Sequence, residues 1–262
     1  MSKINLPQIY TEEVWKRSGN QNHFKYIGLP YVSWSQIESF NDKVGFNTGL
    51  EGKFEYIIKY FSKYKFDDMG WGNFGSQAES WITLRNADRS LLDVKTLQDL
   101  EAAEKNFKDV EKKVLETIEP LGVFQEEICY YVEELGVIVL GYIDDRTPEK
   151  GDKIDLLRDY KTKSLASKKD LHLPKKHQIE LYILGFRQQG LFVQNAEYCI
   201  IERLGGGECM RGGGRESLYV GTNVWYEPYI WNEERLKVTN KMVVNTVKQI
   251  SDLYAVYNNY FG

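Results

Sequence analysis

The sequence predicts an α/β fold, with a mixed central sheet flanked by helices and a helical part at the N-terminus. Over much of residues 35–119, apolar and charged side chains recur at helical spacing, which predicts helices. From Val123 onward, runs of β-branched and aromatic residues bounded by turn residues predict strands. A helical segment separates two of these strands, as it does where a crossover joins parallel strands. Together these observations predict the mixed sheet.

The N-terminal segments are predicted as follows. The first thirty residues are polar and mixed, and we expect an arm or loop there. Residues 35–64 predict two helices broken near Gly45–Gly49, because apolar side chains share one face in each half. A glycine-rich turn over Met69–Gly75 is expected to precede a helix that carries Glu79.

One long helix or two are predicted over residues 90–119, ended by Pro120 and Gly122. We therefore expect two parts packed as one compact unit. The first, residues 1–119, is helical and contributes Glu79 to a site. The second, residues 120–262, is the core with its C-terminal helix.

The core segment begins with a predicted hairpin, whose strands over 123–132 and 137–143 are joined by a turn at Glu133–Gly136. The expected elements that follow are a strand over 153–161, a helix over 174–189, strands over 192–203 and 217–226 that flank a glycine-rich hairpin tip at Gly205–Gly214, and a long amphipathic helix over 233–260.

Composition limits the class of protein. The chain has 262 residues, of which 42% are hydrophobic and 27% charged, and this excludes a fully disordered chain. The formal net charge is -4, so any surface that attracts nucleic acid has to be local.

The cysteines and the apolar runs indicate a cytoplasmic protein. Cys129, Cys199 and Cys209 are too scattered for a disulfide scaffold, lack a CxxC pair and are expected to be core residues. No apolar signal segment opens the sequence, and the longest apolar run, Val137–Leu140, is far too short to span a membrane. We therefore expect a soluble protein with no membrane partner.

Two aspartates and a lysine carry the most informative pattern. Side chains alternate along a strand, so Asp159 and Lys161 share one face, and a hairpin would bring Asp144 to the same end. Two carboxylates with water can hold Mg²⁺. A lysine beside them can orient an attacking water or stabilise the charge that develops on a phosphate. The alternative is that Asp144 and Asp145 are turn residues and Asp159 is an exposed edge charge.

Two features on predicted helices support a metal-dependent site at Asp144 and Asp159. Gln178 and Tyr182 lie one turn apart on a predicted helix, so they share a face that could border the site, although an ordinary polar stripe would look the same. Glu180 lies on another face of that helix and is expected to be dispensable. Glu79 adds a third carboxylate after a glycine turn.

A basic strip follows the Asp159 strand. Residues 161–176 hold six lysines and one acidic residue, Asp170, in a chain that is acidic as a whole. This predicts either a groove that follows phosphates or a solvated loop. The lysines are Lys161, Lys163, Lys168, Lys169, Lys175 and Lys176.

Taken in order, these motifs resemble the PD-(D/E)XK nuclease superfamily, in its RecB-like and phage-type exonuclease branch. The motifs are Gly141–Asp144 as Gly-x-x-Asp, Asp159–Thr162 as Asp-x-Lys-Thr, and Gln178–Tyr182 as Gln-x-x-x-Tyr. Ser33–Ser35 is similar to the Ser-x-Ser helix opening of that branch, and Glu79 stands where the family carries His or Glu.

The resemblance implies a restriction-endonuclease-like core and a Mg²⁺- or Mn²⁺-dependent deoxyribonuclease, expected to be an exonuclease of DNA repair or recombination. Glu79, Asp144, Asp159 and the Tyr160 carbonyl would hold the metal, and Lys161 would be the catalytic lysine. DNA would contact the side chains of Gln178, Tyr182, Lys163, Lys168, Lys169, Lys175 and Lys176.

Two departures from the family's motifs bear on the expected cofactor and on the branch of the family. Many relatives hold an iron–sulfur cluster with one Cys near the position of Lys43 and three near the C-terminus, which this chain lacks, so we expect no cluster. Glu79 in place of the His of RecB itself is more similar to phage-type exonucleases, in which case the protein would act in the cytoplasm of the host cell.

The sequence leaves the partners undecided and is compatible with two rival functions. The expected partner is single- or double-stranded DNA, and a recombination or replication protein could be a second one. One rival is a non-catalytic nucleic-acid-binding or recombination-partner protein that kept the fold. Another is a hydrolase of RNA or of a small molecule on a different α/β fold.

Overall fold

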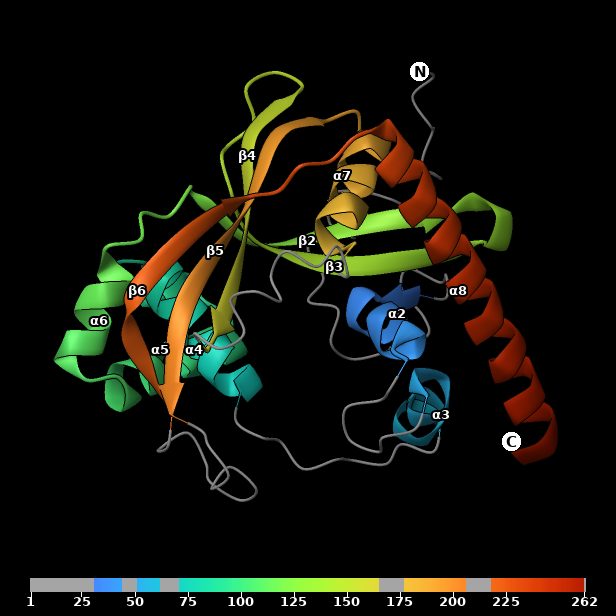
Figure 1. The fold of residues 1–262 in the computed structure, drawn as a ribbon, viewed down its shortest axis with the longest axis horizontal. Coiled ribbons are helices and arrows are strands. Elements are labelled where there is room, and N and C mark those ends of the chain that lie inside the picture. The colour runs from blue at the N-terminus through green and yellow to red at the C-terminus, as the bar shows by residue number, and fades with distance from the viewer. Residues whose placement is uncertain (1–30, 44–50, 62–70, 165–176, 206–217, 262) are drawn as a thin grey trace.

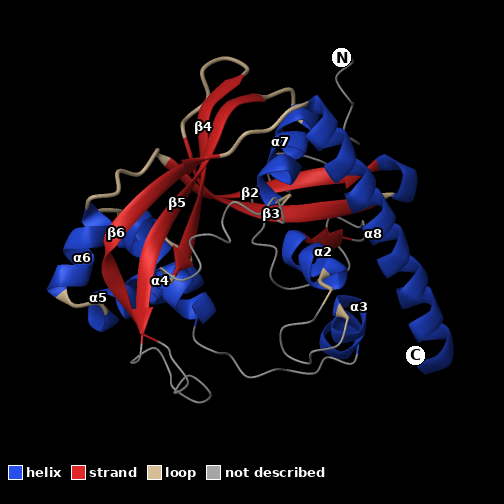
Figure 2. Ribbon diagram, in the orientation of Figure 1, coloured by secondary structure: helices blue, strands red, loops and turns tan. Residues whose placement is uncertain are grey.

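A computed structural model describes residues 31–43, 51–61, 71–164, 177–205 and 218–261 (Figure 1). The expected arm over residues 1–30, the start of the helix expected at Pro174 and the glycine-rich tip beyond Gly205 lie outside these ranges. Within them, a six-stranded mixed sheet is flanked by helices (Figure 2). The strands are β1 (Tyr31–Ser33), β2 (Val123–Val132), β3 (Val137–Arg146), β4 (Lys153–Lys163), β5 (Phe192–Gly205) and β6 (Leu218–Pro228).

Strand β3 organises the sheet because it pairs with three others. One edge pairs antiparallel with β2 along its whole length. The other edge pairs in parallel with β1 through Ile138–Leu140 and antiparallel with β4 through Asp145 and Arg146. The stretch Gly141–Asp144 therefore lies between these two partners. Beyond the short contact with β3, β4 diverges from it, as Figure 1 shows.

The other half of the sheet contains the predicted crossover. Strands β4 and β5 are parallel, and helix α7 (Gln178–Gln188) lies between them in sequence. Strand β6 then pairs antiparallel with β5. The expected strands, the turn Glu133–Gly136 and the crossover are thus confirmed.

Each half of the sheet has its own helical cover (Figure 1). On the β4–β6 half, Phe74, Ala78 and Ile82 belong to one buried cluster with Tyr160 and Cys199. This cover consists of α4 (Trp71–Leu84), α5 (Val94–Asn106) and α6 (Asp109–Glu116).

The β1–β3 half is covered by helices from both ends of the chain. Ile37 and Phe40 belong to a buried cluster with Val243 and Val247, so the N-terminal and C-terminal helices share one core. The helices are α2 (Trp34–Asn41), α3 (Gly52–Tyr56), the π-helical turn Ile57–Phe61, α7 and α8 (Glu233–Phe261). None of the helices in the described ranges has both the length and the apolar character needed to cross a membrane.

Two expectations for the N-terminal part are corrected. Helix α4 already begins at Trp71, so Gly72 and Gly75 lie inside it instead of forming the expected turn. Burial of Phe74 and the apolar residues one and two turns later stabilises this helical start. The sequence does not predict strand β1, because three residues carry no periodicity, and only pairing with β3 makes them a strand.

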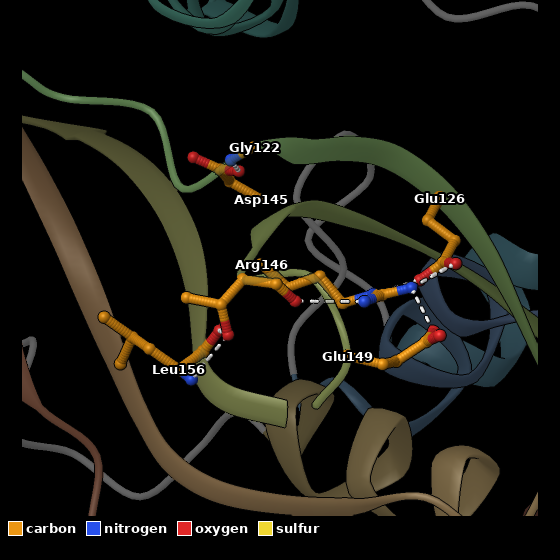
Figure 3. A network of polar contacts seen from close by, with 7 residues as sticks. Gly122, Glu126, Asp145, Arg146, Glu149 and Leu156 are labelled. Carbon is orange, nitrogen blue, oxygen red and sulfur yellow. Dashed lines mark hydrogen bonds and ion pairs between the residues drawn. The ribbon is translucent and has the colours of Figure 1, made fainter. Parts of the chain in front are cut away.

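The end of β3 is fixed by a buried arginine, shown in Figure 3. Arg146 donates to both carboxylate oxygens of Glu126 at 2.5 and 2.7 Å and to Glu149 at 2.8 Å. The neighbouring Asp145 accepts hydrogen bonds from the backbone N–H groups of Leu121 and Gly122. Asp144 and Asp145 both lie within β3 and are therefore strand residues, and not turn residues.

Glu180 connects α7 to α8, which contradicts its expected dispensability. Its side chain is fully buried and accepts from Arg235 Nε at 2.5 Å and from Thr239 Oγ1 at 2.8 Å. His177 Nδ1 lies 2.7 Å from the same carboxylate. Burial alone would raise the pKa of Glu180, but the hydrogen bonds from His177 and Arg235 outweigh it and lower the pKa to about 2.

Glu180→Gln is therefore expected to lower the free energy of unfolding at pH 7 by roughly 3 kcal/mol, as for a broken buried ion pair. The folded pKa lies below the unfolded value, so the contribution of Glu180 is present above about pH 4.3 and lost as the pH falls towards 2. Urea unfolding at pH 7 and pH 3 tests this, with the exposed Glu234→Gln on α8 as control. Equal stability of wild type and Glu180→Gln at pH 7 would contradict it.

Candidate metal and active site

Asp159 and Lys161 lie together on one face of β4, as strand alternation predicts. The Asp159 side chain is fully buried, and Lys161 Nζ forms an ion pair with its Oδ2. Its Oδ1 is buried and accepts no hydrogen bond. A buried carboxylate oxygen without a donor is costly, which marks this atom as a place for a ligand.

Asp144 reaches the same place from β3. Its Oδ2 accepts a hydrogen bond of 2.7 Å from the backbone N–H of Tyr160. This contact comes next to the last pair of the β3–β4 ladder, Asp145 with Arg158, so a side chain takes over where the ladder stops. The Tyr160 side chain points to the other face, where its hydroxyl donates to Asp145 at 2.8 Å. The hairpin geometry expected for the two aspartates is therefore present.

Glu79 comes from α4 and is partly buried. Its Oε1 accepts a hydrogen bond from Gln125 Nε2 on β2. The packing of α4 against β4 brings Glu79 to the point where β3 and β4 diverge, because Phe74, Ala78 and Ile82 share a buried cluster with Tyr160. Glu79 is thus placed by its helix and by one contact from a strand.

The carboxylates repel one another. Burial raises the pKa of Glu79 to about 7, and the charges of Asp159 and Asp145 add to this. Burial also raises the pKa of Asp144 well above its usual range, with further increases from Glu79 and Asp159. The hydrogen bond from Gln125 and the charge of Lys161 only partly offset the shift of Glu79. A further cation in this place would relieve the repulsion.

Lys161 stays charged. Burial would lower the pKa of Lys161, but the charges of Asp159 and Asp144 outweigh it and hold the pKa above its ordinary value. The charge of Glu38 on α2, which no sequence motif marks, also raises the pKa of Lys161. The ammonium is therefore a permanent donor and not a base at neutral pH.

The oxygen donors suit Mg²⁺ or Mn²⁺, although the expected three-carboxylate shell is not assembled. In the described part of the chain, no three His, Cys, Asp or Glu side chains are grouped so that they could hold a metal ion alone. Mg²⁺ requires only one or two carboxylates because it keeps several waters. The free Oδ1 of Asp159 and the carboxylate of Asp144 meet that requirement.

Tyr182 and Gln178 border the site from α7, but Tyr182 is buried. Gln178 Nε2 donates to the Tyr182 hydroxyl at 2.5 Å, and that hydroxyl donates to the Tyr142 carbonyl at 2.6 Å. A Cβ at Gly141 would lie 2.5 Å from the Tyr182 ring. Gly141 and Tyr182 thus fit together, and the ring packs against the strand β3 that carries Asp144. With 1% exposure, Tyr182 offers no surface for DNA to contact, so the expected contact of its side chain with DNA is corrected.

Gly141→Ala is expected to lower the free energy of unfolding by about 1–3 kcal/mol, because the added methyl group overpacks a filled core. Gly72→Ala is the matched control, since a Cβ there meets nothing within 4 Å. Urea unfolding of both variants checks the expectation. A Gly141→Ala protein as stable as wild type would show that the ring does not need this glycine.

The remaining expected DNA contacts are only partly described. Lys163 ends β4, two residues after Lys161 and on the same strand face. Lys168, Lys169, Lys175 and Lys176 lie outside the described residues. The helix opening at Ser33–Ser35 is confirmed, with Ser33 as the N-cap of α2 and Gln36 completing the capping box.

The expectation that the cysteines are core residues is confirmed for the two that the structure describes. Cys129 and Cys199 are buried, and Cys209 lies outside the described residues.

No protein-family model matches the chain, and no curated protein matches it either. Among solved structures, the chain is similar to a crystal structure of a putative exonuclease from Eubacterium rectale, with 12% sequence identity and a TM-score of 0.48. The alignment covers 84% of this chain and 79% of that chain. A similarity of this extent assigns neither a family nor a function to the chain.

Proposed function

We propose that the protein is a metal-dependent DNA nuclease of the PD-(D/E)XK type that hydrolyses phosphodiester bonds. The observation that carries the proposal is the buried carboxylate of Asp159, which is paired with Lys161 and has a free oxygen beside Asp144. Asp144 and Asp159 lie where β3 and β4 diverge. They are the aspartates of the Gly-x-x-Asp and Asp-x-Lys motifs.

The electrostatics favour an enzyme over a protein that only binds nucleic acid. Glu79 and Asp144 carry raised pKa values because they are buried close to other carboxylates. Such an arrangement costs stability, and a surface that only follows phosphates needs lysines instead. Buried acids beside a lysine are typical of a site that performs chemistry.

Within this proposal each residue has a role. Asp144 and Asp159 would hold Mg²⁺ or Mn²⁺. Glu79, which is not grouped with them in the structure, would join them together with the Tyr160 carbonyl when the cation binds. The cation, when bound, would supply positive charge that neutralises the carboxylates and polarises the phosphate. Lys161 donates an N–H to the scissile phosphate and stabilises the charge that develops there.

DNA would approach along the Lys161–Lys163 face of β4. Lys163 and the other lysines of the basic strip would contact phosphates, and Gln178 would hold a phosphate oxygen or a water. Each lost phosphate contact is expected to reduce the slope of log affinity against log salt by about 0.7–0.9. An unchanged slope after Lys→Gln replacement of Lys163, Lys168, Lys169, Lys175 and Lys176 would leave the strip without a role in binding.

Digestion of end-labelled DNA tests the proposed function. Linear, end-blocked and circular substrates are incubated with Mg²⁺, with Mn²⁺ or with EDTA. We expect metal-dependent loss of linear DNA from free ends, with blocked and circular DNA spared. DNA binding without cleavage under any condition would favour the non-catalytic rival, and cleavage of RNA or of small phosphodiesters alone would favour another hydrolase.

A further inference from the structure

Gln125 has an unusual backbone for a residue inside a strand. Its φ is 52°, in the left-handed region that residues with a Cβ seldom adopt. The pairs Phe124 with Asp145 and Glu126 with Ile143 place it opposite Asp144. Among the described residues it is the one non-glycine position with positive φ. Strain of this kind persists where the surrounding structure holds it, and it gathers at functional sites.

The side chain of Gln125 shows what the strained backbone achieves. Its amide Nε2 donates to Oε1 of Glu79, across the boundary between the sheet and α4. Glu79 is otherwise carried by a helix that packs through its apolar face, which fixes the position of the backbone but not the direction of the carboxylate. The left-handed residue turns an amide from the edge of the site towards that carboxylate.

We propose that Gln125 is a positioning residue that holds the Glu79 carboxylate near Asp144 and Asp159, so that Glu79 would join them as a ligand when the cation binds. The inference rests on the proposed function, because it gives Glu79 the role of a metal ligand. An amide suits this task since its N–H orients one carboxylate oxygen and leaves the other for a cation. Hydrogen bonds to metal ligands of this kind strengthen metal binding.

Two substitutions separate the amide from the backbone. Gln125→Gly removes both the amide and the strain, because glycine adopts positive φ without a steric cost. Gln125→Ala removes the amide and keeps the strain. Gln194→Ala is the matched control, since Gln194 is exposed on β5 and its amide contacts only a nearby carbonyl, that of Phe192.

The test is a Mn²⁺ titration of the melting temperature, without DNA, alongside cleavage assays. We expect the metal-free Gln125→Gly protein to melt above Gln125→Ala. Both should need about 10-fold more Mn²⁺, or more, than wild type and Gln194→Ala for the same rise in melting temperature. A Gln125→Gly protein that responds to Mn²⁺ like wild type would overturn the role of Gln125 and leave the proposed function intact. Loss of Mn²⁺ response in Gln125→Ala alone would assign the effect to the backbone and would also overturn it. A wild type that shows neither a Mn²⁺ response nor cleavage would overturn the proposed function itself, together with this inference.

Discussion

Asp144→Asn is expected to lower the rate of DNA cleavage by about 10²–10³-fold or more, because it removes a charge that would hold the cation and the phosphate in place. The fold should survive, since the Asn amide oxygen can still accept the hydrogen bond from Tyr160 N–H. Burial and the charges of Glu79 and Asp159 raise the pKa of Asp144, so ionised Asp144 destabilises the metal-free protein. We therefore expect Asp144→Asn to melt at or above the wild-type temperature at pH 8.

A matched control for this experiment lies on the turn before β4. Asp152 is exposed and lies outside the site, so Asp152→Asn changes the same functional group without touching the carboxylate cluster. Single-turnover cleavage and thermal unfolding are measured for both variants. An Asp144→Asn protein that cleaves at the wild-type rate would remove Asp144 from the site.

Lys161→Ala is expected to cut the single-turnover rate at saturating metal by about 10²-fold or more, as for loss of a donor to the transition state. The acids around Lys161 hold its pKa above the ordinary value, so the wild-type rate should not fall at mildly basic pH through loss of this proton. Lys153→Ala, at the exposed start of the same strand, is the control. Because the change leaves Asp159 without its cation, folding is checked by circular dichroism.

Two results would contradict the role given to Lys161. One is an unchanged single-turnover rate at saturating metal together with a collapse of metal affinity, which would make Lys161 a structural partner of Asp159. The other is a wild-type rate that falls as a lysine proton is lost near pH 9, which would make Lys161 a base.

The sequence was informative where the signal is local. Alternation along β4 placed Asp159 and Lys161 on one face, and the hairpin pattern brought Asp144 to them. The i, i+4 spacing also placed Gln178 and Tyr182 together on α7. These relations depend on the repeat of a strand or helix, which the residues themselves display.

Features set by distant segments could not be predicted in this way. Glu180 was expected to be dispensable because its helix face points away from the site, yet α8, more than fifty residues later, buries that face. Gln125 carries no local signal for a left-handed backbone, and its contact with Glu79 depends on where α4 packs. The one sequence feature related to the burial of Tyr182 is Gly141. That glycine leaves room for the Tyr182 ring, but this is visible only once the tertiary contact is known.

Cleavage of end-labelled linear DNA by Asp159→Asn, measured beside wild type in Mn²⁺ and in EDTA, tests the central claim most directly. Asp159 combines complete burial, an oxygen without a hydrogen bond and an ion pair with Lys161, so the proposed site depends on it more than on any other residue. We predict cleavage by wild type in Mn²⁺ and none in EDTA, with a folded Asp159→Asn protein inactive in both. Cleavage by Asp159→Asn at the wild-type rate, or undiminished cleavage by wild type in EDTA, would contradict the account.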